Sequence, residues 1–244
     1  MFAKLFVFFS VLFLGACSSS SHLNYEIGVD PSWRPLDFQE KQKNILGFST
    51  ELLTKISAKE HLSISLLNTN WDSLFDGLKS KKYQAVLSSL YPYNFNKELY
   101  NFSDPFLEIG PVLVLPLQSP KLSLKDLSGK AVGILEGSPD VLLLEKDPSI
   151  LIRNYVSAPV ALNALVSGEI EAALIPILTA SSYVDHIYFK KLKIGSPPLT
   201  DEGLRLITLK GDNVQLIEKF NQALQLFKKN GEHEKLLLKW NISN

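Results

Sequence analysis

The chain has 244 residues, of which 45% are hydrophobic and 20% are charged, as is usual for a globular protein. Lysine and arginine together number 25, and so do aspartate and glutamate, which argues against nucleic acid or a charged membrane surface as a partner. A chain of this length forms one large domain or two lobes.

The N-terminus has the pattern of a secretory signal peptide. Lys4 precedes an almost wholly apolar run at 5–14, which is too short to span a membrane comfortably. The sequence LGAC then resembles the lipobox of bacterial lipoproteins, in which the cysteine, here Cys17, is lipidated and becomes the first mature residue. Because Cys17 is the only cysteine, it has no disulfide partner within the chain. We expect a signal peptide at 1–16 and a lipidated serine tether at 17–23, which anchors the protein by acyl chains such as palmitate in the cell envelope, outside the cytoplasm.

The residues after the tether alternate between short apolar runs and helical periodicity. Strand, helix, strand, helix and strand follow in order, which is typical of a parallel sheet covered by helices. The expected elements are a strand at 25–29, a helix with Phe48, Leu52 and Ile56 on its buried face, a strand at 63–67, a helix from Trp71 with Asn70 as N-cap, and a strand at 85–88.

A second unit of the same kind begins near residue 112. Strands are expected at 112–117, 130–135, 151–156 and 170–175, with helices at 158–168 and 178–184 and a further helix that Ser138 caps, with Pro139 at its first position. A strand at 203–209 and helices at 213–229 and 231–240 complete the chain. We predict an α/β fold with two lobes, 24–110 with 205–244 and 111–204, and two crossovers between them.

Two lobes joined by two crossovers create a cleft between them. In open α/β sheets, ligands bind beyond the carboxyl ends of the strands. We therefore expect the cleft to be lined by residues 30–34, Trp71, residues 88–96 and residues 137–138.

Seven motifs together resemble the periplasmic solute-binding proteins that serve polar amino-acid ABC transporters. They are IGVDPSWRPLDF, GFSTELLTKIS, WDSLFDGLKSKKYQAVLSS, FSDPF, LKDLSGKAVGILEGS, ALVSGEIEAAL and the final KW, and they cover nearly the whole mature chain. The resemblance implies a periplasmic-binding-protein-like fold, a small solute in the cleft, by family default a polar amino acid, and an ABC permease with its ATPase as partners. It also implies a monomer without cofactors.

The resemblance also implies positions for the solute contacts. Two aromatic rings, Trp33 and Trp71, correspond to those that sandwich the bound amino acid, although Trp71 also fits a core position on its helix. Strand-end hydroxyls of the family match Ser88 and Ser89, and its helix N-terminus that receives the carboxylate matches Gly137 and Ser138, where Asp140 would compete with an anion. The expected ligand-binding residues are Asp30, Trp33, Trp71, Ser88, Ser89, Tyr91, Asn96, Gly137 and Ser138, with no catalytic or metal-binding residue.

Two positions depart from the amino-acid-binding pattern. Asn96 stands where the family has a carboxylate-binding arginine, and Pro176 stands where it has an ammonium-binding aspartate. Shifting the alignment by one residue would place Lys97 at the arginine position, and Arg34 and Asp30 are candidates for compensation. The pattern therefore predicts a solute-binding protein and leaves its solute open.

Two other functions fit the same fold. Some periplasmic dehydratases share it, and Asp30 or Glu136 would be the general base of such an enzyme. The sequence has no HExxH, Gly-x-Ser-x-Gly, Walker-type or CxxC motif, so a binding protein is favoured. A lipoprotein that binds another envelope protein in place of a small molecule is the third interpretation.

Overall fold

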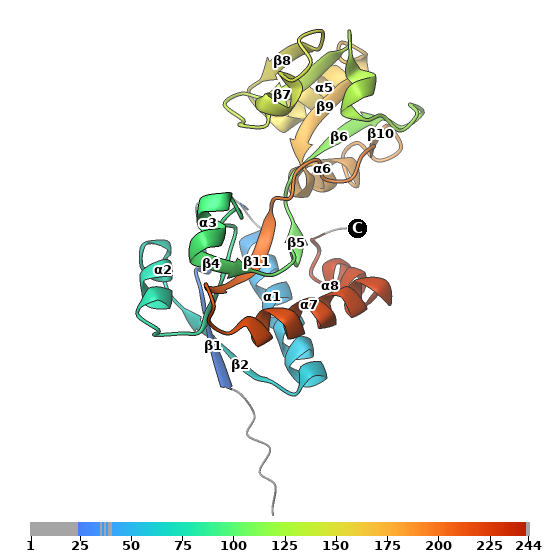
Figure 1. Ribbon diagram of the computed structural model, residues 1–244. Helices are drawn as coiled ribbons and strands as arrows, with labels where there is room; N and C mark the ends of the chain where they lie inside the picture. Colours follow the sequence, from blue (N-terminus) through green and yellow to red (C-terminus); the bar gives the residue numbers. More distant parts are fainter. Residues whose placement is uncertain (1–23, 35, 37, 39–40, 243–244) are drawn as a thin grey trace, which may run out of the picture.

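The computed structural model describes residues 24–34, 36, 38 and 41–242. The predicted signal peptide and lipidated tether lie outside these residues. Figure 1 shows two α/β lobes, one above the other, joined by two extended segments.

The first lobe is built on a mixed sheet with the strand order β2-β1-β3-β11-β4, in which β5 also pairs with β11. β1 (Asn24–Val29) lies parallel to both β2 (Ser63–Asn68) and β3 (Ala85–Ser88), as predicted. The return strand β11 (Gly203–Leu209) is antiparallel to β3, to β4 (Tyr100–Phe102) and to β5 (Leu107–Glu108). The sheet is therefore parallel only in its first three strands.

Helices cover both faces of this sheet. α1 (Gln42–Glu60), α7 (Val214–Lys229) and α8 (Glu232–Lys239) share one apolar cluster with β1, β3 and β11, and the predicted apolar face of α1 is buried in it. α2 (Trp71–Lys79) packs on the other face, and the Asn70 side chain caps it by accepting a hydrogen bond from Ser73 N at 3.0 Å, as predicted. The short α3 (Asn94–Leu99) leads into β4.

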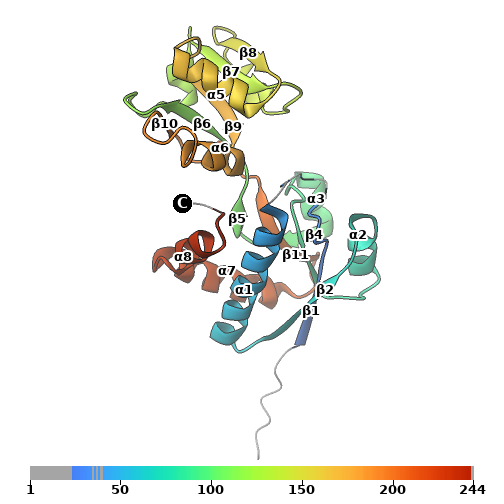
Figure 2. The same cartoon turned by 180° about the vertical axis from the view of Figure 1, so that it is seen from behind.

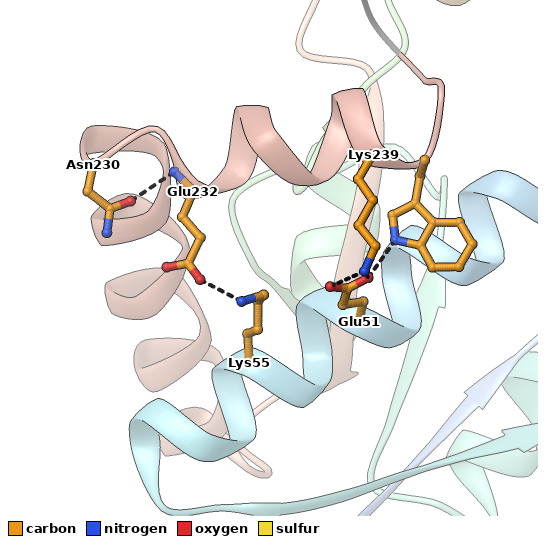
Figure 3. A network of polar contacts seen from close by, with 6 residues as sticks. Glu51, Lys55, Asn230, Glu232 and Lys239 are labelled. Atoms are coloured by element: carbon orange, nitrogen blue, oxygen red, sulfur yellow. Dashed lines mark hydrogen bonds and ion pairs between the residues drawn. The ribbon is translucent and has the colours of Figure 1, made fainter.

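Polar contacts fasten the C-terminal helix α8 to α1, as Figure 3 shows. Lys239 pairs with Glu51 at 2.7 Å, and Lys55 pairs with Glu232 at 2.7 Å. Trp240 donates from Nε1 to the same Glu51 carboxylate at 2.9 Å while its ring packs against the core of the first lobe. Trp240 is thus a packing residue of the first lobe.

The second lobe is built on a sheet with the order β10-β6-β9-β7-β8. Its strands are β6 (Pro111–Pro116), β7 (Ala131–Leu135), β8 (Leu151–Tyr155), β9 (Ala172–Pro176) and β10 (Leu192–Ile194). α5 (Ala158–Ser167), which ends at Gly168 as predicted, and α6 (Ile177–Val184) cover one face, and the 3-10 helix η2 (Leu124–Leu127) and α4 (Val141–Leu144) cover the other.

The start of α4 differs from the prediction. The helix has four residues and Asp140 as its N-cap, so Ser138 does not cap it and Pro139 precedes it. Ser138 N donates to Leu135 O at 3.1 Å, which closes a turn directly after β7. Because this turn uses residues 135–138, the helix begins beyond them.

The lobes meet at α6 and at the crossing segments, as the opposite views in Figures 1 and 2 both show. Leu178 of α6 packs against the core of the first lobe. β6 begins directly after the first crossing and β11 follows the second, which suits the proposed division into 24–110 with 205–244 and 111–204.

Candidate functional site

Three polar side chains form a row at the carboxyl end of the first-lobe sheet. Ser88 of β3 is paired with Arg205 of β11, and the β1–β3 register, continued by one residue, places Asp30 beside Ser88. Asp30, Ser88 and Arg205 are 6%, 3% and 4% exposed. A buried polar row at this end of a sheet is the arrangement expected of a ligand site.

Asp30 is held by the turn that follows β1. Its Oδ1 accepts hydrogen bonds from Ser32 N at 2.9 Å and from Ser32 Oγ at 2.7 Å. Its other oxygen, Oδ2, is buried and has no partner in the described part of the chain. Leaving a buried carboxylate oxygen without a hydrogen bond costs folding free energy. Oδ2 of Asp30 can therefore accept a hydrogen bond from a ligand, which would remove this cost.

Ser88 and Ser89 end β3, and their environments differ. Ser88 is buried and its Oγ accepts a hydrogen bond from Leu90 N at 3.2 Å, so it caps the backbone there. That bond leaves the hydroxyl proton of Ser88 available as a donor. Ser89 is half-buried.

The segment that follows β3 is organised around Asn96. Asn96 is 8% exposed, and its Nδ2 donates to Tyr91 O at 2.8 Å, which ties α3 to the preceding loop. The rings of Tyr91, Tyr93 and Phe95 form a ladder with centroids 4.5 Å and 5.4 Å apart. Asn96 carries no charge and its amide is already engaged, so it does not replace an arginine that binds a carboxylate.

Trp33 is a core residue in this structure, although the family resemblance predicts that it contacts the ligand. It is 3% exposed and belongs to the cluster that contains Phe48 and Leu52. Its positive φ of 59° and the bond from Trp33 N to Asp30 O at 2.9 Å turn the chain so that the indole is buried. Contact with a solute therefore stays a prediction, for which this structure offers little indole surface.

Trp71 is the first residue of α2 and is half-buried. It makes an edge-to-face contact with Phe75, with ring centroids 6.2 Å apart. Part of its indole surface is exposed, so both of the predicted roles, packing and ligand contact, remain compatible with its position.

The turn at Gly137 and Ser138 lies in the second lobe, next to buried acidic groups. Ser138 Oγ donates to Asp140 Oδ2 at 3.0 Å, and Asp140 is 8% exposed. Burial raises the pKa of Asp140, and burial together with the charge of Asp140 raises the pKa of Glu202. Two carboxylates near a four-residue helix make this turn a poor place for an anion.

The two larger cavities between the lobes are lined by residues of both. One of about 460 Å³ is bounded by Phe38 and Lys41 of the first lobe and by residues of the second that include Leu135, Ser157 and Tyr183. The other, of about 260 Å³, includes Phe106 and His233 of the first lobe and Leu178 of the second. Neither contains any of the nine predicted ligand-binding residues, so their assembly around one solute stays a prediction.

Sequence reasoning missed Lys41 and Arg205. Burial lowers the pKa of Lys41, whose Nζ lies 3.4 Å from Ile242 O. No periodic pattern marks Lys41, because it lies in the polar stretch before α1. Arg205 did carry a signal, since it is the one charge inside the apolar run GLRLITL.

Comparison with known proteins decides the family. The sequence profile of the bacterial extracellular solute-binding proteins, family 3, matches residues 25–243. The chain belongs to this family. As a solute-binding protein it has the periplasmic-binding-protein-like fold that the motifs predicted, and the family supports binding over catalysis.

Two curated relatives and a solved structure show the extent of the similarity. This solute-binding protein is 30% identical to the arginine-binding extracellular protein ArtP of Bacillus subtilis, over 93% of this chain and 92% of the relative. It is 27% identical to the histidine-binding periplasmic protein of Escherichia coli, over 89% and 87%. The fold is similar to that of the L-cystine solute receptor of Neisseria gonorrhoeae, crystallised in the unliganded open conformation, with a TM-score of 0.69, 20% identity, and 90% and 93% of the two chains covered.

Neither a metal-binding cluster nor a membrane-spanning helix is found among the described residues. No group of three or more His, Cys, Asp and Glu side chains within residues 24–34, 36, 38 and 41–242 is arranged to hold a metal ion. None of the helices described for this solute-binding protein combines the length and the apolar character that a membrane crossing requires.

Proposed function

We propose that this solute-binding protein captures an amino acid between its lobes and delivers it to the permease and ATPase of an ABC importer. The observation that carries this proposal is the match to relatives named as arginine- and histidine-binding proteins over about nine-tenths of the chain. The polar row of Asp30, Ser88 and Arg205 supports it, because an amino acid presents charged donors and acceptors that such a row can pair.

Solute capture shifts the equilibrium between an open and a closed arrangement of the two lobes. A solute that contacts both lobes binds the closed arrangement more tightly and raises its population. In this proposal Asp30 and Ser88 form the floor of the site, and Trp71, Ser89, Tyr91 and Asn96 form its first-lobe wall. Gly137 and Ser138 would approach from the second lobe, with Trp33 supporting the floor from the core.

A thermal-shift screen of the mature protein against the common L-amino acids tests this function. At a concentration of one hundred times Kd, a ligand stabilises its protein by about 2.7 kcal/mol, which raises the Tm of a chain of this size by about 5–10 °C. We expect at least one amino acid to do so, together with a change in tryptophan emission. The matching D-amino acids are the control. Flat curves with every amino acid, and no retained ligand in native mass spectrometry, would contradict the proposal.

We also propose that Cys17 carries the lipid that anchors the protein in the cell envelope. The LGAC sequence and the absence of any other cysteine support this, and the relatives include extracellular and periplasmic proteins. Labelled palmitate is expected to enter the full-length protein in bacterial cells and to be lost in Cys17→Ala. Ser19→Ala is the matched control, and equal labelling of the two variants would reject the anchor.

A further inference from the structure

Arg205 is the buried guanidinium of this protein. The sequence has three arginines. Arg34 and Arg153 are exposed, whereas Arg205 is 4% exposed in the interior of β11. Burying a guanidinium costs free energy unless its charge and its N–H groups are paired, so the partners of Arg205 show what the position requires.

Those partners leave the guanidinium incompletely satisfied. Arg205 donates from Nη1 to Ser103 O at 2.8 Å and from Nη2 to Asp201 O at 2.8 Å. It also pairs with the Asp201 carboxylate at 2.6 Å. Its Nε is buried and has no partner among the residues that the structure describes. The guanidinium therefore has an N–H group, at Nε, that is free to donate a further hydrogen bond, and a positive charge that favours an anionic acceptor.

The counter-ion of Arg205 is a solvent-exposed carboxylate, that of Asp201. The Asp201 side chain is 63% exposed and that of Arg205 is 5% exposed. Asp201 belongs to the segment that crosses from the second lobe to β11, and its carboxylate reaches back four residues to the buried guanidinium. An exposed carboxylate contributes little to stability and is readily replaced by another.

The position of Arg205 matches that of a ligand-binding residue. Arg205 and Ser88 are cross-strand neighbours, so their side chains lie on the same face of the sheet. Asp30 follows on the next strand, and two strand spacings put its Cα about 10 Å from that of Arg205. At one end of the row Asp30 Oδ2 has no partner among the described residues, at the other end Arg205 Nε has none, and the Ser88 hydroxyl lies between them.

We propose that Arg205 binds the carboxylate of the solute and that Asp201 occupies this position until the solute displaces it. Asp30 would receive the ammonium group through Oδ2, so the row pairs with both charges of an α-amino acid. This inference rests on the proposed function and makes it more specific, because it requires a solute with a free carboxylate.

Pairs of ligands that differ by the carboxylate alone test the assignment. Calorimetry of the mature protein with L-arginine and agmatine, and with L-histidine and histamine, gives the Kd ratio of amine to amino acid. A charge-assisted hydrogen bond corresponds to a ratio of about ten- to hundredfold. We expect such a ratio in the wild type, a ratio near one in Arg205→Gln, and an unchanged ratio in the control Arg153→Gln.

Two further variants keep the test decisive if Arg205→Gln does not fold. Arg205→Lys keeps the charge and loses the planar fork, so its ratio should fall between those of the wild type and Arg205→Gln. Asp201→Asn removes the competing carboxylate and should raise the ratio about two- to fivefold, the range that an exposed ion pair supports. A ratio that falls in Asp201→Asn, or stays unchanged in Arg205→Lys, would overturn the assignment.

The outcomes separate this inference from the function on which it rests. A wild type that binds an amino acid and its amine equally well would overturn the role of Arg205 while leaving solute capture intact. A folded Arg205→Gln that keeps a tenfold ratio would do the same. A wild type that binds none of the four ligands, nor any amino acid in the thermal-shift screen, would reject the proposed function and the role of Arg205 with it.

Discussion

Replacing Trp33 by alanine is expected to lower the free energy of unfolding by about 3–5 kcal/mol, the cost of removing a large aromatic side chain from a core. The indole is 3% exposed and packs in the first-lobe cluster. Its Nε1 is buried without a partner in the described chain, so the loss is that of packing and apolar burial. Urea unfolding of the mature protein at 25 °C measures the change.

Phe189→Ala is the matched control for Trp33→Ala. Phe189 is 63% exposed in the second lobe, so its removal should change the free energy of unfolding by less than about 0.5 kcal/mol. If Trp33→Ala costs as little as the control and weakens solute binding, Trp33 is a ligand contact and its buried position here does not describe the bound state.

Replacing Tyr83 by alanine should have an effect of similar size, about 3–5 kcal/mol. Tyr83 is 1% exposed, and its hydroxyl donates to Leu74 O in α2 at 2.5 Å. Its ring fills the space over two glycines, since a Cβ would come within 2.7 Å of it at Gly28 and within 2.5 Å at Gly77. Tyr83 thus fixes α2 to β1, and with it the position of Trp71, the first residue of α2.

Tyr83→Phe separates the ring from the hydroxyl. It retains the packing and loses one hydrogen bond, so urea unfolding should show a loss of about 1 kcal/mol. The alanine variant should also shift the fluorescence of Trp71 in the native baseline, whereas the phenylalanine variant should not. Equal losses in the two variants would show that the hydrogen bond, and not the ring, holds α2.

Local periodicity was enough to predict most elements of the fold. The apolar face of α1, the Asn70 cap and the run GLRLITL each depend on residues close in sequence, and the structure has them where they were predicted. α3 was missed because aromatic and asparagine residues favour helices weakly and the segment reads as a loop. Ser138 was misassigned because Ser-Pro-Asp fits a helix start equally well as the turn that ends β7.

The site was less accessible to sequence reasoning, because its geometry depends on strand register. Asp30 and Ser88 were identified from their positions at strand ends, and the β1–β3 register, continued by one residue, brings them side by side. Arg205 joins them only through the antiparallel pairing of β11 with β3, which no local pattern specifies. The burial of Trp33 likewise follows from a positive φ in its loop, and tryptophan carries no sequence signal for that conformation.

The order of the strands along the chain has a consequence for the way the molecule assembles. β11 lies between β3 and β4 but is synthesised after the whole second lobe, so these two strands lack their shared neighbour until about five-sixths of the chain has emerged. The second lobe needs no strand from the C-terminal end of the chain. Within it, Leu199 N donates a hydrogen bond to Pro111 O at 2.8 Å, which joins the end of the lobe to its beginning. Its contacts are nearer in sequence, so it should fold first and leave the first lobe with unpaired strand edges meanwhile. The first lobe therefore depends on the last forty residues of the chain for its completion.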